Sequence, residues 1–226
     1  MTYQKKSSKK GLIAITLIVI LAVASGVTLY VYLSTVHVGV KVGDTFTYSL
    51  RGDVTLTAAN ATMDPGFEQY NQTDYFKVTI TAIEGTRITL SSDWKFLNGT
   101  IVNFQQNIDL ANGDKTDENG FWAIYASNLN KGELLRPKGA DGQVVNNTDT
   151  APYAGGTRSR CSWHIENEFY DYTDTTYSTL MYDIRNIFFD RETGMLLSLE
   201  NYQLYNKPEK TQVIYWTLTD SSVWDV

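Results

Sequence analysis

The chain has 226 residues, a formal net charge of -6 and a hydrophobic content of 42%. This length fits one or two domains, and this hydrophobic content is sufficient for a packed core and too high for a disordered tail. The acidic balance argues against nucleic acid as a partner, because phosphate recognition needs a basic surface. One cysteine excludes an internal disulfide, and two histidines argue against a zinc site.

The N-terminus predicts a membrane anchor. Residues 1–10 form a basic tail with four lysines and no acid, and residues 11–33 follow without a charge. As a helix, the second stretch would cover roughly 35 Å, enough to cross a hydrocarbon core of about 30 Å. The positive-inside rule keeps the tail cytoplasmic. The sequence therefore predicts a single-pass transmembrane helix at 11–33, a linker at 34–37 and an extracytoplasmic domain at 38–226.

Two other interpretations of the N-terminus stay open. Ala22-Val23-Ala24 matches a signal-peptide cleavage site, which would release a secreted β protein. Lys9-Lys10-Gly11 before an apolar helix is similar to the processing site of archaeal type IV pilin precursors, which would indicate a filament subunit. All three interpretations place the rest of the chain outside the cytoplasm. The four tail lysines leave 15 of the 19 basic side chains against 25 acidic ones there, so we expect a soluble, acidic domain.

Alternation of apolar and polar residues dominates the chain from Val38 onward and predicts antiparallel β structure. Turns are expected at Gly52-Asp53, Asn98-Gly99 and Arg191–Gly194, because glycine allows the backbone conformations that tight turns need. The predicted strands cover residues 38–42, 45–51, 54–58, 74–83, 86–97, 100–110, 177–190, 195–205 and 210–220.

One amphipathic helix is predicted at residues 119–131, before a glycine that suits the position after a helix end. Its apolar face would be formed by Phe121, Ile124, Tyr125 and Leu129. A shorter helical turn is expected after Asp64-Pro65. Residues 132–157 are rich in Gly and Asn and predict a long exposed loop. The predicted fold class is mainly β, of the α+β type, with a curved antiparallel sheet and one or two short helices.

An acidic stretch before the predicted helix offers oxygen ligands. Calcium prefers such hard ligands, and it is abundant enough outside the cell to fill weak sites. The spacing does not follow the EF-hand pattern, and the simpler explanation of the stretch is a solvated loop that caps the helix. The candidate ligands for a weakly bound calcium ion are Asp109, Asp114, Asp117 and Glu118, and no other cofactor is expected.

Four N-x-Ser/Thr sequences would be glycan acceptors on an exported domain. They begin at Asn60, Asn71, Asn98 and Asn146. If the domain lies outside the cytoplasm, the sequence therefore predicts a glycoprotein with up to four attachment sites.

Nucleophile and base pairs are scarce in this chain. Cys161 and His164 would point to opposite faces of a strand, so they form no thiol–imidazole pair, and a half-buried histidine among aromatic residues is expected. Ser92-Asp93-Trp94-Lys95 matches S-x-x-K but lies in a predicted strand rather than at a helix start. The sequence predicts no enzymatic site.

Aromatic side chains are the remaining candidates for ligand contact, at 13% of the chain. They cluster in a Thr- and Asp-rich stretch late in the sequence, where they would stack on sugar rings or line a lipid groove. Cross-strand packing needs such residues equally. The candidates for a ligand-binding face are Trp163, Tyr170 and Tyr172.

Two segments carry resemblances to known families. The segment from Phe188 to Leu196 resembles the late strand–turn–strand hairpin of LolA-like lipoprotein carriers, which implies a half-barrel crossed by helices. An apolar anchor followed by Val40-Lys41-Val42-Gly43-Asp44-Thr45-Phe46 is similar to the start of many uncharacterised archaeal membrane-anchored surface proteins. That second family has no firm activity to carry over to this chain.

The sequence thus leads to two hypotheses of function outside the cytoplasm. In the first, a non-enzymatic binding domain holds an apolar or glycan ligand in the concave face of its sheet, with an apolar cavity beneath a helix at 120–130. In the second, the chain is a subunit of an envelope or filament assembly, with exposed strand edges that self-associate. A hydrolase, with His164 or a close pair of carboxylates in a cleft, ranks below both.

Overall fold

The structure, a computed structural model, describes residues 18, 21, 23, 36–116, 122–170 and 180–226. The predicted transmembrane segment at 11–33 falls outside these residues except at three positions. Within the described residues, no helix is long and apolar enough to cross a membrane. The chain divides into two compact units, Met1–Thr35 and Val36–Val226, and the second unit carries the fold.

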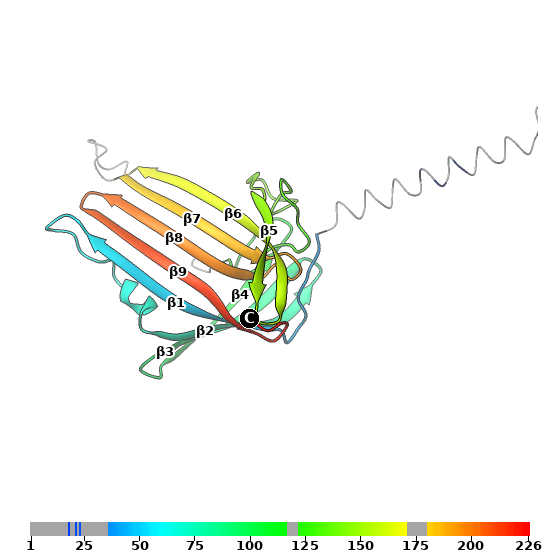
Figure 1. Ribbon diagram of the computed structural model, residues 1–226, viewed down its shortest axis with the longest axis horizontal. Helices are drawn as coiled ribbons and strands as arrows, with labels where there is room; N and C mark the ends of the chain where they lie inside the picture. Colours follow the sequence, from blue (N-terminus) through cyan, green and yellow to red (C-terminus); the bar gives the residue numbers. More distant parts are fainter. Residues whose placement is uncertain (1–17, 19–20, 22, 24–35, 117–121, 171–179) are drawn as a thin grey trace, which may run out of the picture. The chain divides into compact units, whose positions relative to one another are not determined.

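A single antiparallel sheet dominates Val36–Val226, as the mainly β prediction requires (Figure 1). Nine strands are present in the described residues, and their order across the sheet is β4-β3-β2-β1-β9-β8-β7-β6-β5. Their bounds are β1 Thr45–Leu56, β2 Thr73–Glu84, β3 Arg87–Phe96, β4 Ile101–Asp109, β5 Asn147–Tyr153, β6 Gly156–Tyr170, β7 Leu180–Asp190, β8 Leu196–Asn206 and β9 Glu209–Ser221.

The sheet consists of two meanders that meet in its centre. β1 to β4 form one and β5 to β9 form the other, and they join where β1 pairs with β9 from Phe46–Ser221 to Leu56–Lys210. The predicted meander of β2, β3 and β4 and the predicted late hairpins of β7, β8 and β9 are confirmed. In Figure 1, β6 to β9 and β1 run side by side, and β2 and β3 continue the sheet at a different slant.

Every second side chain is buried along most strands, and the buried side chains share one face, here called the inner face. Leu50 lies opposite Trp216 and Tyr48 opposite Phe76 in neighbouring strands, so the pairing aligns the buried sets. The Tyr48 hydroxyl donates to the Leu196 carbonyl at 2.9 Å, which satisfies a buried polar group. The inner face includes Phe46, Tyr48, Leu50, Val78, Ile80, Ile88, Leu90, Ile187, Trp216 and Leu218.

The predicted turn at Gly52-Asp53 is wrong, because β1 runs through it without interruption. A Cβ atom on Gly52 would lie 2.7 Å from Cε1 of Phe67, so the glycine allows a ring to lie directly on the strand. Phe67 begins the 3-10 helix η1, Phe67–Tyr70, which confirms the helical turn expected after Asp64-Pro65.

The predicted strand at 38–42 is also wrong. β1 already pairs with β2 on one side and with β9 on the other, so no edge is left for this segment. The segment instead runs irregularly past the end of the sheet, where Val40 is buried and the Gly43 N–H donates to the Ile80 carbonyl at 2.8 Å.

The helix predicted at 119–131 is wrong over the described part, residues 122–131, which contains no helix. The chain there is extended: Ile124 forms a β-bridge with Met195, and Ser127 forms one with His37. The prediction assumed an amphipathic helix with one buried and one exposed face. All residues from Ala123 to Ser127 are buried, so this segment has no exposed face. Because the described residues 122–130 form no helix, the expected cavity has no helix to cover it there, and the side chains from Ala123 to Ser127 are themselves buried.

The expected long loop at 132–157 is only partly a loop. β5, Asn147–Tyr153, lies inside it and pairs with β6 to form one edge of the sheet. Leu135 and Val145 are buried, and Leu134 forms a bridge with Val144. The polar composition of β5 concealed it, since an edge strand has little surface to bury.

Candidate functional site

Four aromatic rings lie together on the inner face where the sheet reaches the β3–β4 hairpin. Trp94 and Phe96 from β3 share this face with Phe104 from β4, because even-numbered residues point inward on both strands. Tyr70, at the end of η1, brings the fourth ring. The ring centroids of Trp94 and Phe96 are 4.8 Å apart, those of Trp94 and Phe104 6.4 Å, and those of Tyr70 and Trp94 6.3 Å. We call Tyr70, Trp94, Phe96 and Phe104 the aromatic patch.

The aromatic patch is partly open to solvent and firmly anchored. Phe104 is 39% exposed, and the other three rings are half-buried. The Trp94 indole N–H donates to Oγ1 of Thr73 at 2.8 Å, which fixes the plane of the ring. Phe76 lies beneath, with its centroid 6.1 Å from Trp94 and 4.8 Å from Trp216 in the core. The patch therefore presents preorganised aromatic surface.

A buried amide lies on the same face as these rings, two residues beyond Phe104. Gln106 follows Phe104 by two residues on β4 and so shares the inner face, where it is 8% exposed. Its Nε2 atom is buried without a hydrogen-bond partner among the described residues. Leaving such a donor unsatisfied costs about 1–3 kcal/mol.

Aromatic faces next to an amide donor suit one kind of chemistry. A pyranose ring presents C–H groups on its faces and hydroxyls on its rim, so it stacks on aromatic rings and accepts hydrogen bonds at its edge. The hairpin tip is apolar as well, with Leu97 70% exposed and Ile101 49% exposed.

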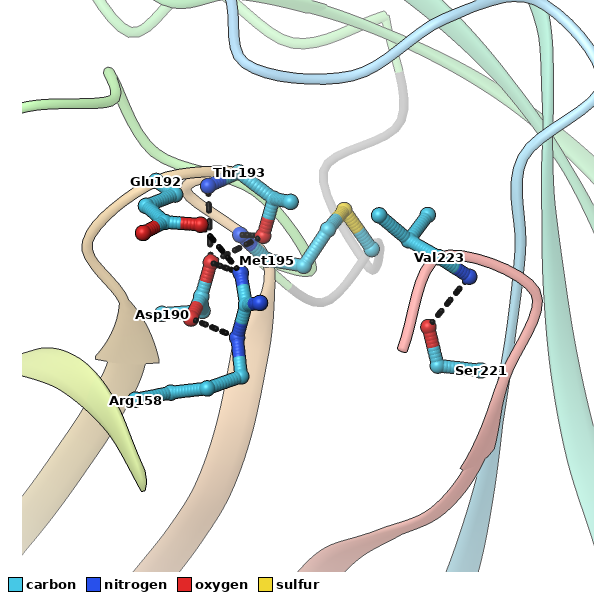
Figure 2. A network of polar contacts seen from close by, with 7 residues as sticks. All are labelled: Arg158, Asp190, Glu192, Thr193, Met195, Ser221 and Val223. Carbon is cyan, nitrogen blue, oxygen red and sulfur yellow. Dashed lines mark hydrogen bonds and ion pairs between the residues drawn. The ribbon is translucent and has the colours of Figure 1, made fainter. Parts of the chain in front are cut away.

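The most buried charge belongs to a structural network (Figure 2). Asp190 is completely buried at the end of β7, and its carboxylate accepts from Arg158 at 2.8 and 3.0 Å. The same carboxylate accepts from the Thr193 N–H at 2.7 Å and hydroxyl at 2.8 Å, which closes the β7–β8 turn. Hydrogen bonds to Asp190 raise the pKa of the Arg158 guanidinium, and Arg158 also lies 4.2 Å over the Trp224 ring. The Asp190 carboxylate is thus satisfied internally, so the network stabilises the turn.

A second polar cluster holds the loop before η1 against β8 and β9. Asp64 accepts from the Tyr205 hydroxyl at 2.8 Å, from Nε2 of Gln212 at 2.7 Å and from the ammonium of Lys210. Burial alone would raise the pKa of Asp64, but the three hydrogen bonds outweigh it and the pKa is lowered. This carboxylate stays charged and paired, which argues for a structural role.

Two of the predicted calcium ligands, Asp109 and Asp114, accept hydrogen bonds from nearby residues. Oδ1 of Asp109 accepts from the Thr86 hydroxyl at 2.7 Å and from the Ala111 N–H at 2.9 Å. Oδ2 of Asp114 accepts from Nδ2 of Asn112 at 2.7 Å. Asp117 and Glu118 lie outside the described residues. In the part of the chain that the structure describes, no three His, Cys, Asp or Glu side chains gather as a metal site would require.

The predicted ligand-binding face is only partly described. Tyr172 lies outside the described residues, and the same holds for the side chain of Tyr170. Trp163 is 5% exposed and donates its indole N–H to Oε1 of Gln143 at 3.1 Å. Its ring contacts that of Tyr125 at 6.0 Å, so Trp163 belongs to the core.

The four sequons differ in what their asparagines contact. Asn71 accepts from the Gly52 N–H at 2.9 Å and donates to its carbonyl at 2.7 Å, on the stretch of β1 that has separated from β2. Oδ1 of Asn98 accepts from the Thr100 N–H, and that of Asn146 accepts from the His164 N–H. Asn60 is exposed in a turn. The Asn71 side chain thus satisfies the backbone of β1, whereas the Asn60 side chain is exposed.

Cys161 and His164 lie on opposite faces of β6, as predicted. Cys161 is completely buried, and burial raises the pKa of its thiol to about 12, so the reactive thiolate is scarce near neutral pH. His164 is exposed rather than half-buried among aromatic residues, and its Nδ1 lies 2.8 Å from Oδ1 of Asn186. The two groups cannot act on one substrate.

No protein-family model matches this chain, and no curated protein matches it significantly. The site is therefore judged on its geometry. Sequence reasoning considered Trp94 only as part of S-x-x-K and did not identify the aromatic patch. The signal was present, because a turn at Asn98-Gly99 places residues 94, 96, 102 and 104 on one face.

Proposed function

We propose that this chain is a membrane-anchored surface protein whose β domain binds a glycan, without catalysis, through the aromatic patch. The observation that carries the proposal is the partly exposed aromatic face of Trp94, Phe96 and Phe104, with Gln106 two residues beyond Phe104 and its amide nitrogen without a partner among the described residues. The basic tail at 1–10 and the uncharged stretch at 11–33 support the anchor and the location outside the cytoplasm.

A glycan fits this geometry better than an apolar cargo. An apolar ligand needs an enclosed apolar volume that removes most of its surface from water. The space against the inner face near β7 and β8 is occupied by Ile124 and Tyr125, both buried, with the Tyr125 ring 4.5 Å from that of Phe189. The aromatic patch is by contrast an open platform, which is suited to stacking a sugar ring.

The glycan hypothesis predicts that Phe104→Ala weakens binding about tenfold, the loss expected from one stacked ring. Chitohexaose and cellohexaose are suitable probes because β-linked gluco-sugars expose C–H groups on both ring faces. Calorimetric titration of the full chain, in a detergent without a sugar headgroup, measures the change. Tyr75→Ala is the matched control, since Tyr75 lies on the outer face of the same meander, with Lys95 over its ring. If neither sugar binds, or if both variants lose affinity equally, the proposal fails.

The anchor hypothesis predicts that protein extracted from its own membranes still carries residues 1–36, which its intact mass will show. Mass spectrometry distinguishes the alternatives directly. A chain that begins at Leu12 would indicate pilin-like processing, and one that begins after Ala24 would indicate a secreted protein. Either start contradicts the anchor without touching the glycan hypothesis.

A further inference from the structure

One edge of the sheet has backbone groups that point away from it. The Phe96 N–H donates to the Thr100 carbonyl at 2.9 Å, so this pair closes the β3–β4 hairpin. Hydrogen-bonded pairs alternate along an antiparallel ladder, so Val102 and Phe104 exchange their hydrogen bonds with β3. The N–H and C=O groups of Ile101, Asn103 and Gln105 consequently point outward from the edge.

The far end of β4 confirms this alternation and is already covered. The Asn107 carbonyl accepts from the Thr116 N–H at 3.2 Å, and the Asn107 N–H donates to the Thr116 hydroxyl at 3.1 Å. The Asp109 N–H donates to the Asp114 carbonyl at 2.9 Å. Among the described residues, no chain segment pairs with the edge from Ile101 to Gln105, and all five of these residues are exposed.

This edge, unpaired within the described residues, lacks the usual protection against pairing. Natural edge strands are blocked by charged side chains, proline or short length. β5, the opposite edge, carries Asp149 and Pro152. Residues 101–108 of β4 contain no charged residue and no proline.

We propose that β4 pairs with β4 of a second copy of this chain, antiparallel and with Asn103 on the two-fold axis. This register uses every outward-pointing group: Ile101 pairs with Gln105 of the second copy, Asn103 pairs with its counterpart, and each such pair exchanges two hydrogen bonds. A register centred on Phe104 would require Asn107, which Thr116 already occupies. The covered end of β4 therefore selects the register.

The side chains favour a second copy as the occupant. On the inner face, Val102 of each copy lies opposite Phe104 of the other, a favourable β-branched–aromatic pair. On the outer face, two Asn103 amides meet on the axis; Nδ2 already donates to Oδ1 of Asp93 at 2.7 Å, and its own carbonyl remains able to accept. No like charges meet along the ladder. The two copies would join their aromatic patches into one surface, although the pairing does not depend on glycan binding.

Cysteine cross-linking tests the register on the full chain in membranes. Asn103→Cys places two thiols in a hydrogen-bonded pair with Cα atoms about 5.5 Å apart, within the range for a disulfide. We expect a covalent homodimer under mild oxidation. Gln105→Cys lies opposite Ile101 of the second copy, and Thr150→Cys is exposed on β5, so neither variant should cross-link. The single native cysteine is buried and gives no background.

The outcomes separate the proposal from its rivals. Equal cross-linking of Asn103→Cys and Gln105→Cys, or no cross-linking of Asn103→Cys, overturns the proposed register. A cross-link to a different protein overturns the claim that the partner is a second copy of this chain. Asn103→Lys tests the pairing without a thiol, because it sets two ammonium groups against each other on the axis. We expect this variant to sediment as a monomer under conditions in which the unchanged chain is a dimer. A dimer in both would overturn the proposal.

Discussion

Asp190→Ala should lower the free energy of unfolding by about 3–5 kcal/mol, the usual cost of removing one partner from a buried ion pair. The carboxylate is completely buried and satisfies both Arg158 and Thr193. Without it, a guanidinium with 18% of its surface exposed loses its main partner, and the β7–β8 turn loses its internal hydrogen bonds. Urea unfolding of the full chain, followed by tryptophan fluorescence, measures the difference.

Asp149→Ala is the control, because it removes an exposed ion pair instead of a buried one. Asp149 pairs with Arg160 at 2.6 Å, but 43% of its side chain is exposed, and exposed pairs contribute about 0–1 kcal/mol. If Asp190→Ala does not fold, Asp190→Asn should give an intermediate loss, because its amide oxygen still accepts from Thr193. Similar losses for Asp149→Ala and Asp190→Ala would contradict the role assigned to the buried network.

Local patterns were sufficient to predict the hairpins. Alternation predicted β2, β3 and β4, and a turn at Asn98-Gly99 brought β3 and β4 together. The late hairpin through Arg191–Gly194 was predicted in the same way. In each case the partners are close in sequence, so the turn residues fix the pairing.

Pairings between segments that are distant in the sequence could not be predicted from local patterns. β1 and β9 join the two meanders in the centre of the sheet, and no turn residue records that contact. The chain from β4 to β5 must pass from one edge of the sheet to the other, which is why residues 123–127 are buried on all sides. A continuous apolar run of that kind fits a helix or an extended segment equally well by period alone.

The aromatic patch was only partly within reach of the sequence. Positions 94, 96, 102 and 104 fall on one face once the Asn98-Gly99 turn is placed. Whether that face is closed or open depends on where the β4–β5 connection runs, and of its described part residues 124 and 125 contact the β7–β8 turn. Among the described residues, the Gln106 amide nitrogen has no hydrogen-bond partner, and no sequence pattern indicates this.

Gly194→Ala should lower the free energy of unfolding by about 3–5 kcal/mol, from backbone strain and overpacking together. Gly194 has φ +76°, and a Cβ atom there would lie 2.0 Å from the carbonyl oxygen of Tyr125. The contact is between two backbones, since the Tyr125 N–H also donates to the Gly194 carbonyl at 2.9 Å. The methyl group would force the buried segment away from the β7–β8 turn.

Gly85→Ala isolates the backbone strain, because Gly85 has φ +64° and a Cβ atom there would meet nothing within 4 Å. We expect this control to lose about 1–2 kcal/mol, the usual cost of a left-handed backbone for an L-residue. The difference between the two variants, measured by urea unfolding, is then the cost of separating residues 123–127 from the turn. If the two losses are equal, the segment yields freely and does not fill the space against the inner face as tightly as its burial indicates.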